Sequence, residues 1–318
     1  MMSRAKQRGR AALLVHLAAT VLIYFIPVRV TPQTNNRVVL NVTVTTEKGE
    51  AILDLTRENF LVNIDKRPQN VLSFNGEMPA SIGILIDTSG SLERDGKKSV
   101  TQLKENLKAG LNRFVQLAHR DNEYFVMTFD KDTELLQDWT NDLSTITNKL
   151  DSFEFKGQTV LYDAIAEAIP KVMGGRNARH VLIIVTDGDD SYSKTEKKHL
   201  YETLKRSDVV LYPVGILNEK DKSVWGGYYR PGARVLEDLA AVSGGRPSFS
   251  VHYTKSAAFT EAFESIALEL RSQYQLVVSS EESVGKEKWN KLNVSVTRND
   301  PSGRSQKFIV RTRQGYYR

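Results

Sequence analysis

The sequence contains no cysteine, and this absence excludes several kinds of chemistry. Disulfide bonds, thiolate metal sites, a cysteine nucleophile and a lipid-anchored cysteine are impossible in this chain. Long low-complexity stretches and internal repeats are missing too. The 318 residues, 40% of them hydrophobic, are typical of a globular protein with one large domain and a smaller module.

Motifs typical of nucleotide-binding enzymes are also missing. No Gly-x-Gly-x-x-Gly segment follows a first strand, and there is no phosphate-binding Gly-Lys-Ser/Thr loop. A phosphatase of the haloacid dehalogenase kind needs a second aspartate two residues after Asp87, where this chain has Ser89. The five histidines have no spacing that suggests a metal pair or a catalytic triad. We therefore expect a protein that is not an enzyme, and keep a metal-dependent hydrolase as an alternative.

Acidic residues are absent from residues 1–36, which hold five basic residues of the chain. Because the formal net charge is +6, the remainder carries only +1. This balance does not call for a nucleic-acid partner. A basic stretch, Arg4–Arg10, precedes an apolar run over residues 11–27, which is the order of a secretory signal or membrane anchor.

We interpret residues 1–36 as a signal peptide or signal anchor followed by a linker. The apolar run is short for a relaxed membrane span, which takes about 20 residues, and no clear cleavage site follows it. A buried amphipathic helix is the other interpretation of this run. We expect an exported protein, periplasmic or extracellular, that is either secreted or anchored to the inner membrane through residues 11–27.

A β segment is predicted for residues 37–77. Apolar and polar residues alternate from Val38 to Val44, a period of two. Further strands are expected at Ala51–Leu53, Phe60–Ile64 and Val71–Phe74, with a turn over Asp65–Pro68. Residues 273–318 return to a β pattern, and we infer that the two β segments pack together as one small module.

Residues 78–272 have strands alternating with helices. Ser81–Ile86 and His180–Val185 are apolar runs of the kind that form parallel strands buried on both faces. The other expected strands cover residues 123–129, 133–139, 209–214 and 247–251, and the expected helices cover residues 97–119, 164–173, 194–205, 235–242 and 257–273. This order predicts an α/β fold: a doubly wound, mostly parallel, Rossmann-like sheet with helices on both faces.

Five oxygen-bearing side chains are expected to meet at the carboxyl edge of this sheet. Asp87, Ser89 and Ser91 follow one buried strand, Asp187 follows another, and Thr159 precedes a helix that returns to the sheet. Ligands bind at this edge in doubly wound folds. Carboxylates and hydroxyls suit Mg²⁺, Mn²⁺ or Ca²⁺, and suit zinc or copper poorly. The aspartates could bind the ion directly or through water.

The pattern Asp87-x-Ser89-x-Ser91, then Thr159, then Asp187 resembles the metal-ion-dependent adhesion site of von Willebrand factor A domains. Related bacterial exported proteins have a similar surrounding sequence. The resemblance implies that a bound cation, usually Mg²⁺, bridges to a carboxylate of an Asp or Glu on a protein partner. It implies adhesion or scaffolding at the cell envelope and does not imply catalysis. The alternative at the residue level is that Asp87 and Ser89 cap a helix and Asp187 belongs to a turn.

Two further features of the sequence have both a functional and a simpler structural interpretation. Four aromatic and basic residues follow a strand that is expected to end at the same carboxyl edge of the sheet, and such residues often anchor protein contacts; they are Trp225, Tyr228, Tyr229 and Arg230. They could equally fold back onto the domain. Asp130 is expected to serve a turn, and Asp189 and Asp190 to be solvated rather than metal-bound. A structural envelope protein whose metal only stabilises the fold remains a further alternative function.

Overall fold

The computed structural model describes residues 37–93, 97–142, 144–217, 231–251, 256–280, 287–299 and 304–317. The chain divides into residues 1–35 and residues 36–318, and the fold is that of the second unit. Across the described ranges, no helix has both the length and the apolar character needed to cross a membrane. The predicted signal or anchor segment, residues 11–27, lies outside these ranges.

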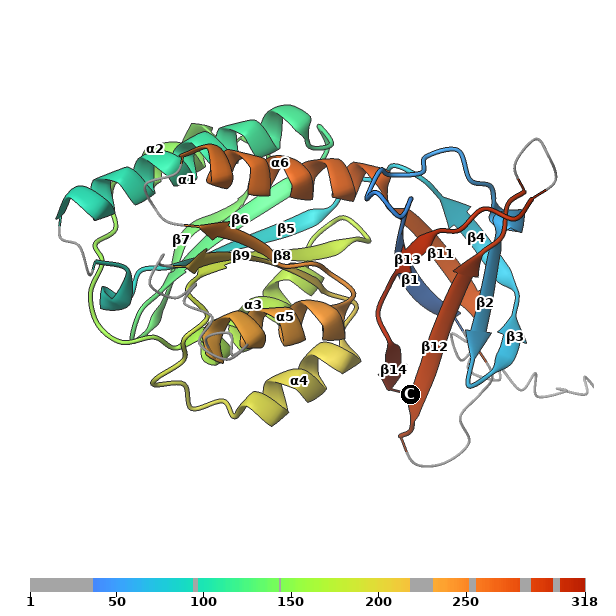
Figure 1. Cartoon of the computed structure of the whole chain (residues 1–318). Helices are drawn as coiled ribbons and strands as arrows, with labels where there is room; N and C mark the ends of the chain where they lie inside the picture. The colour runs from blue at the N-terminus through green and yellow to red at the C-terminus, as the bar shows by residue number, and fades with distance from the viewer. Residues whose placement is uncertain are drawn as a thin grey trace, which may run out of the picture. The chain divides into compact units, whose positions relative to one another are not determined.

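A six-stranded sheet forms the centre of an α/β domain (Figure 1). Its strand order is β10-β9-β8-β5-β6-β7, and all neighbours are parallel except β7, which runs antiparallel to β6. The strands are β5 (Ser81–Asp87), β6 (Glu123–Phe129), β7 (Thr133–Thr140), β8 (His180–Thr186), β9 (Val210–Leu217) and β10 (Ser248–Val251). The prediction of a doubly wound, mostly parallel sheet is confirmed.

Helices cover both faces of this sheet because its central strands are apolar on both sides. In β5, Ile82, Ile84 and Ile86 pack into one core with α1 and α6, while Leu85 packs into a second core with α3 and α4. Figure 1 shows the two helix layers above and below the sheet. The helices are α1 (Lys97–Leu117), α2 (Ser144–Lys149), α3 (Leu161–Met173), α4 (Lys197–Arg206), α5 (Pro231–Ser243) and α6 (Ser256–Ser272).

The strand order reverses beside β5. From β5 the chain builds β6 and β7 on one side, then returns to build β8, β9 and β10 on the other. The crevice of such a sheet opens where the order reverses, outside the carboxyl ends of the strands. Here that point lies between β5 and β8, whose register runs from Ser81 opposite His180 to Ile86 opposite Val185.

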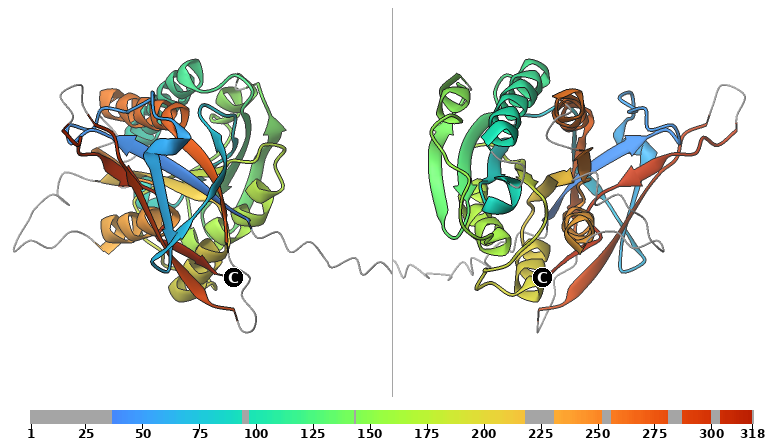
Figure 2. Two further views of the ribbon diagram at one scale, coloured as in Figure 1. Left: turned by 90° about the vertical axis from the view of Figure 1, so that its right-hand side faces the viewer. Right: turned by 60° about the vertical axis from the view of Figure 1, so that its left-hand side comes forward.

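The segments before and after the α/β domain form two four-stranded sheets, of order β13-β1-β11-β4 and β14-β12-β2-β3. The blue N-terminal strands and the red C-terminal strands lie side by side in every view (Figures 1 and 2). Their inward side chains share one apolar core, which includes Leu40, Val62 and Leu276. We call this part the β sandwich. Its strands are β1 (Arg37–Thr45), β2 (Phe60–Ile64), β3 (Arg67–Gln69), β4 (Val71–Asn75), β11 (Tyr274–Ser279), β12 (Trp289–Val296), β13 (Ile309–Arg311) and β14 (Gly315–Tyr317).

In the β segments, one local prediction was wrong, one was right only in part, and a strand was missed. Ala51–Leu53 is not a strand; Ala51 makes only an isolated bridge to Thr45. The predicted turn over Asp65–Pro68 is confined to Asp65 and Lys66, which both have positive φ, and Pro68 already lies in β3. A strand with proline is allowed there because β3 is an edge strand. Strand β14 was not expected, and helix α2 was missed in the α/β domain.

Candidate metal centre

The Asp87 carboxylate is held at the end of β5 by bonds to two neighbouring segments. The backbone N–H of Ser89 donates to Asp87 Oδ1 over 2.9 Å, and the Thr186 hydroxyl donates to Oδ2 over 2.6 Å. The first bond closes a tight turn that is typical of aspartate after a strand. It brings the Ser89 and Ser91 hydroxyl oxygens to 3.0 Å of each other. Three of the five predicted ligands therefore share one short segment.

Asp187 lies at the end of β8 in a turn of the same kind. The backbone N–H of Asp189 donates to Asp187 Oδ1 over 3.1 Å, and that of Gly188 donates to the Thr186 hydroxyl over 3.1 Å. Gly188 has φ of +82°, a conformation that favours glycine, and a Cβ atom there would lie 2.4 Å from the Gly232 carbonyl oxygen. The turn thus depends on glycine at residue 188.

The loop that carries Thr159 is bonded to both of these segments. The N–H of Lys156 donates to the Thr88 carbonyl over 2.8 Å, and that of Gly90 donates to the Gly157 carbonyl over 3.2 Å. On its other side, the Thr159 carbonyl accepts from Ser191 N–H over 3.0 Å. All three predicted segments therefore meet at one edge of the sheet, the metal edge.

Burial makes the electrostatics of this edge unusual. Asp87 is 1% exposed and Asp187 is 4% exposed. Loss of water around Asp87 and, second, the nearby charge of Asp187 together raise the pKa of the Asp87 carboxyl group to about 7, against the lowering effect of the hydrogen bonds from Ser89 and Thr186. Two neighbouring buried carboxylates without a counter-charge are costly, and a cation between them would offset that cost.

The donor set fits a hard divalent cation. It consists of two carboxylates and three hydroxyls, the oxygen ligands that Mg²⁺ and Mn²⁺ accept. Within the ranges described, no group of three or more His, Cys, Asp or Glu side chains could hold a metal ion. The site proposed here is of another kind, because three of its five ligands are hydroxyls and only two are carboxylates. The residues that would hold the ion are Asp87, Ser89, Ser91, Thr159 and Asp187.

Other acidic residues near this edge have structural roles. Asp190 Oδ1 accepts from the Ser193 hydroxyl over 2.6 Å and from Tyr162 N–H over 3.2 Å, which fixes the start of α3. Asp130 Oδ1 accepts from Asp132 N–H over 3.1 Å, in the turn after β6. Away from this edge, His180 Nδ1 lies 2.8 Å from Asp208 Oδ1 at the amino end of β8.

One exposed side chain at the metal edge was missed in the sequence. Tyr192 is 60% exposed, and its backbone N–H donates to the Thr159 carbonyl over 3.0 Å. Its main chain is therefore fixed beside a predicted metal ligand while its ring faces solvent. The predicted contact residues Trp225, Tyr228, Tyr229 and Arg230 lie outside the described residues.

Comparison with known proteins identifies the α/β domain. Residues 82–189, from β5 to just beyond β8, match the von Willebrand factor type A domain family. This match confirms the resemblance predicted from the sequence, and the matched range holds all five candidate metal ligands. No curated protein sequence matches the chain.

Three similar solved structures share low sequence identity with this chain. The PilB minor pilin from Streptococcus sanguinis is 14% identical with a TM-score of 0.48, and the match covers 62% of each chain. BatB from Bacteroides thetaiotaomicron is 15% identical with a TM-score of 0.45, covering 60% of this chain and 98% of that one. A von Willebrand factor type A protein from Catenulispora acidiphila is 12% identical with a TM-score of 0.47, covering 80% and 73%. At these values none of the three assigns a function.

Proposed function

We propose that this chain is a divalent-metal-dependent protein-binding module of the cell envelope. Its five metal-edge side chains would hold Mg²⁺, or Mn²⁺ or Ca²⁺, and the ion would bind an Asp or Glu carboxylate of a partner protein. The observation that carries the proposal is the hydrogen bonding of three separate segments, each with predicted ligands, at the reversal point of the sheet. The domain family suggests an interaction or adhesion module rather than an enzyme.

Charge balance supports a carboxylate on the partner. Asp87 and Asp187 together carry two negative charges when ionised, and hydroxyl ligands add none. A divalent ion in this set is neutralised but keeps room for a further hard oxygen ligand. Because the set holds no excess negative charge, a partner's carboxylate could take the remaining position on the bound ion. The Thr186 hydroxyl and the turn at Ser89 would orient the Asp87 carboxylate for binding that ion.

Specificity would come from side chains around the ion. Tyr192 is the described residue best suited to this role, because an exposed aromatic ring on a fixed main chain loses little freedom on binding. Trp225, Tyr228, Tyr229 and Arg230 stay proposed contact residues. We keep the proposal that the chain is exported, with residues 1–36 as signal or anchor, 37–77 and 273–318 as flanking β segments, and 78–272 as the A domain.

The proposal is tested first with the metal alone. Mg²⁺ or Mn²⁺ added to the chelated full chain should raise its melting temperature, and Asp87→Ala should abolish that rise. Asp132→Ala is the matched control, since Asp132 is an exposed carboxylate on the neighbouring loop. No response to metal in the unsubstituted chain would refute the site. A response that Asp87→Ala leaves intact would refute it equally.

Partner binding is tested by capture from envelope extract with Mg²⁺ and with chelator. The proposal expects the same protein to be captured with Mg²⁺ by the unsubstituted chain and lost with chelator or with Asp87→Ala. Equal capture in every case, together with a normal metal response, would favour the alternative of a structural envelope protein with a fold-stabilising metal. Hydrolytic turnover lost in Asp87→Asn would favour the enzyme alternative.

A further inference from the structure

Only two connections join the β sandwich to the α/β domain, and both are short. Strand β4 ends at Asn75 and β5 begins at Ser81, whereas α6 ends at Ser272 and β11 begins at Tyr274. The second connection is therefore the single residue Gln273. Domains of one chain usually move relative to each other unless their interface is large or rigid. The side chains around these connections decide whether such motion is possible here.

A single buried guanidinium group binds both connections. Arg179, just before β8, is 1% exposed. Its Nη1 donates to the Met78 carbonyl over 2.9 Å, and its Nη2 donates to Gln273 Oε1 over 2.6 Å and to the Leu270 carbonyl over 2.8 Å. A hinge at either connection would leave these buried donors without acceptors, which is unfavourable. Arg179 therefore opposes bending at both places.

Gln273 is held from the sandwich side as well. It is buried, and its Nε2 donates to the Tyr212 hydroxyl of β9 over 2.7 Å and to the Thr43 hydroxyl of β1 over 3.2 Å. One residue thus bonds to both parts of the chain. Gln273, the connection after α6, is therefore buried and hydrogen-bonded like a core residue, unlike a flexible linker.

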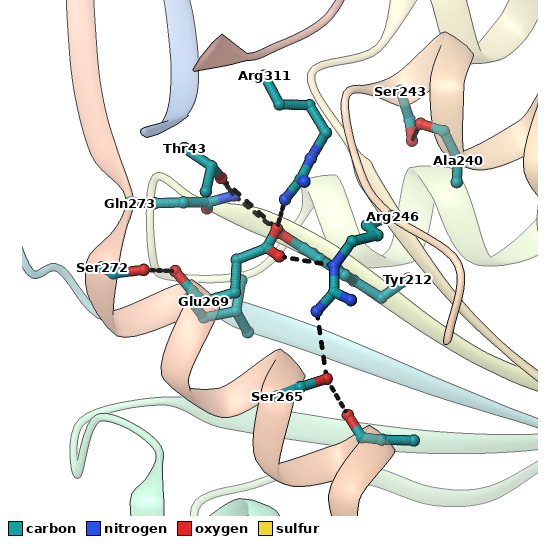
Figure 3. A network of polar contacts seen from close by, with 12 residues as sticks. Thr43, Tyr212, Ala240, Ser243, Arg246, Ser265, Glu269, Ser272, Gln273 and Arg311 are labelled. Carbon is teal, nitrogen blue, oxygen red and sulfur yellow. Dashed lines mark hydrogen bonds and ion pairs between the residues drawn. The ribbon is translucent and has the colours of Figure 1, made fainter. Parts of the chain in front are cut away.

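A second cluster lies beside it, centred on Glu269 of α6 (Figure 3). The Glu269 carboxylate is bonded by Arg311 of β13 and, over 2.9 Å, by the Tyr212 hydroxyl. Its Oε2 accepts from Arg246 Nε over 3.2 Å. Burial and the Glu269 charge raise the pKa of Tyr212 well above its usual range, so this hydroxyl remains a donor. One buried carboxylate therefore joins α6 and β9 to the sandwich strand β13.

Helix α4 makes a further set of contacts with the β sandwich. Arg313 Nη1 donates to the Ser207 carbonyl over 3.0 Å and Nη2 to the Lys205 carbonyl over 3.1 Å, which satisfies carbonyls at the end of that helix. Arg206 of α4 lies over the Tyr317 ring of β14, 4.4 Å from its centroid. The final strand of the sandwich is thus bound to the α/β domain separately from Glu269.

We infer that the β sandwich and the A domain form one rigid body, locked by Arg179 at the two connections and by Glu269 and Arg313 at the interface. The β sandwich then acts as a rigid support for the A domain. It holds the metal edge at a constant distance and orientation from β1, the first described strand. This inference does not depend on metal binding, because none of its residues belongs to the metal edge.

Distances between two spin labels on the full chain test the inference. The absence of native cysteine allows unique labels at Asn293→Cys on β12 and Glu134→Cys on β7, both exposed. Double electron–electron resonance should give one narrow distance distribution. Replacing Arg179, Glu269 and Arg313 together with alanine removes all three of these locks, so the distribution should broaden, as expected for domains that move relative to each other.

The matched control is Glu264→Ala on the same helix. Glu264 pairs with Arg113 of α1 over 2.8 Å, entirely within the α/β domain, so the distribution should stay narrow. If that triple variant does not fold, the variant with Arg179→Lys, Arg311→Lys and Arg313→Lys takes its place, because lysine keeps the charge but lacks the planar fork that donates to several acceptors at once. A broad distribution in the unsubstituted chain would overturn the inference. So would a triple-variant distribution as narrow as that of Glu264→Ala.

Discussion

The hydroxyl of Thr186 donates a 2.6 Å hydrogen bond to Oδ2 of Asp87, which joins the carboxyl ends of β8 and β5. The bond crosses the point where the strand order reverses, and both residues are buried. It fixes the orientation of a carboxylate that we propose as a metal ligand, although Thr186 is not itself one of the five ligands. Groups that orient ligands in this way tune metal affinity strongly.

Thr186→Val should therefore weaken metal binding without unfolding the domain. Valine has nearly the same shape but cannot donate, so Oδ2 of Asp87 loses its hydrogen bond and only the bond from Ser89 N–H still orients the carboxylate. We expect Mn²⁺ affinity to fall by about 10- to 100-fold, measured by calorimetric titration of the full chain. Thr128→Val, at a buried threonine near the end of β6, is the control and should leave affinity unchanged. Equal affinities in the two variants would contradict the role of Thr186.

The stability of the metal-free chain should depend on pH through Asp87. Burial raises the pKa of its carboxyl group from 3.8 to about 7 in the folded state. The folded state therefore holds the Asp87 proton more tightly than the unfolded state does. The contribution of this proton to the free energy of unfolding is complete below pH 3.8 and is lost as the pH rises to about 7. The loss should be on the order of 4 kcal/mol, since each pKa unit is worth about 1.4 kcal/mol.

Urea unfolding with chelator at a series of pH values measures this loss. Asp87→Asn should remove most of the slope, because the amide does not titrate. Excess Mg²⁺ at neutral pH should restore stability by offsetting the buried charge. A metal-free protein whose stability does not fall between pH 4 and pH 7 relative to Asp87→Asn would show that Asp87 is not the buried acid described above.

Two glycines at the metal edge should differ in their tolerance of alanine. Both Gly157 and Gly188 have positive φ, so alanine at either costs about 1–2 kcal/mol in backbone strain. At Gly188 the new Cβ would also lie 2.4 Å from the Gly232 carbonyl oxygen, whereas at Gly157 the nearest atom is Asp130 Oδ2 at 3.4 Å. Gly188→Ala should therefore lower the free energy of unfolding more than Gly157→Ala. The reverse order in urea unfolding would contradict the described turn.

Tyr192→Ala should reduce partner capture while leaving the metal response intact. The ring is exposed beside Thr159 and contributes little to the domain core. Loss of an interface aromatic typically weakens binding by roughly 1–2 kcal/mol, or about 5- to 30-fold. Leu135→Ala, at another exposed apolar residue on β7, is the control for the chelator-sensitive capture experiment. Undiminished capture by Tyr192→Ala would exclude Tyr192 from the contact surface.

The fold of the A domain was predictable because its signals are local. Ser81–Ile86 and His180–Val185 are continuous apolar runs, and each is followed at once by polar residues that parallel strands must bring to one edge. The five candidate ligands could therefore be named without coordinates. The short strands β3 and β14 could not, since three residues have no period to detect.

Contacts between distant segments carried no sequence signal. Nothing in the sequence distinguishes Arg179 and Glu269 from ordinary surface charges, yet both are buried. Arg179 is bonded to both connections between the two parts, and Glu269 is bonded to a strand of the β sandwich. Tyr192 was overlooked because its role depends on a backbone bond to Thr159, which lies 33 residues earlier in the chain. Such features follow from tertiary packing and are visible only once the elements have been placed.

Direct titration of Mn²⁺ into the chelator-stripped full chain tests the central claim most sharply. Electron paramagnetic resonance distinguishes free from bound Mn²⁺ and gives the number of ions per chain. We predict one bound ion in the unsubstituted chain and in Asp132→Ala, and none at the same concentration in Asp87→Ala or Thr159→Val. No bound ion in the unsubstituted chain, or the same bound ion in all four proteins, would contradict the claim that these side chains form a metal site.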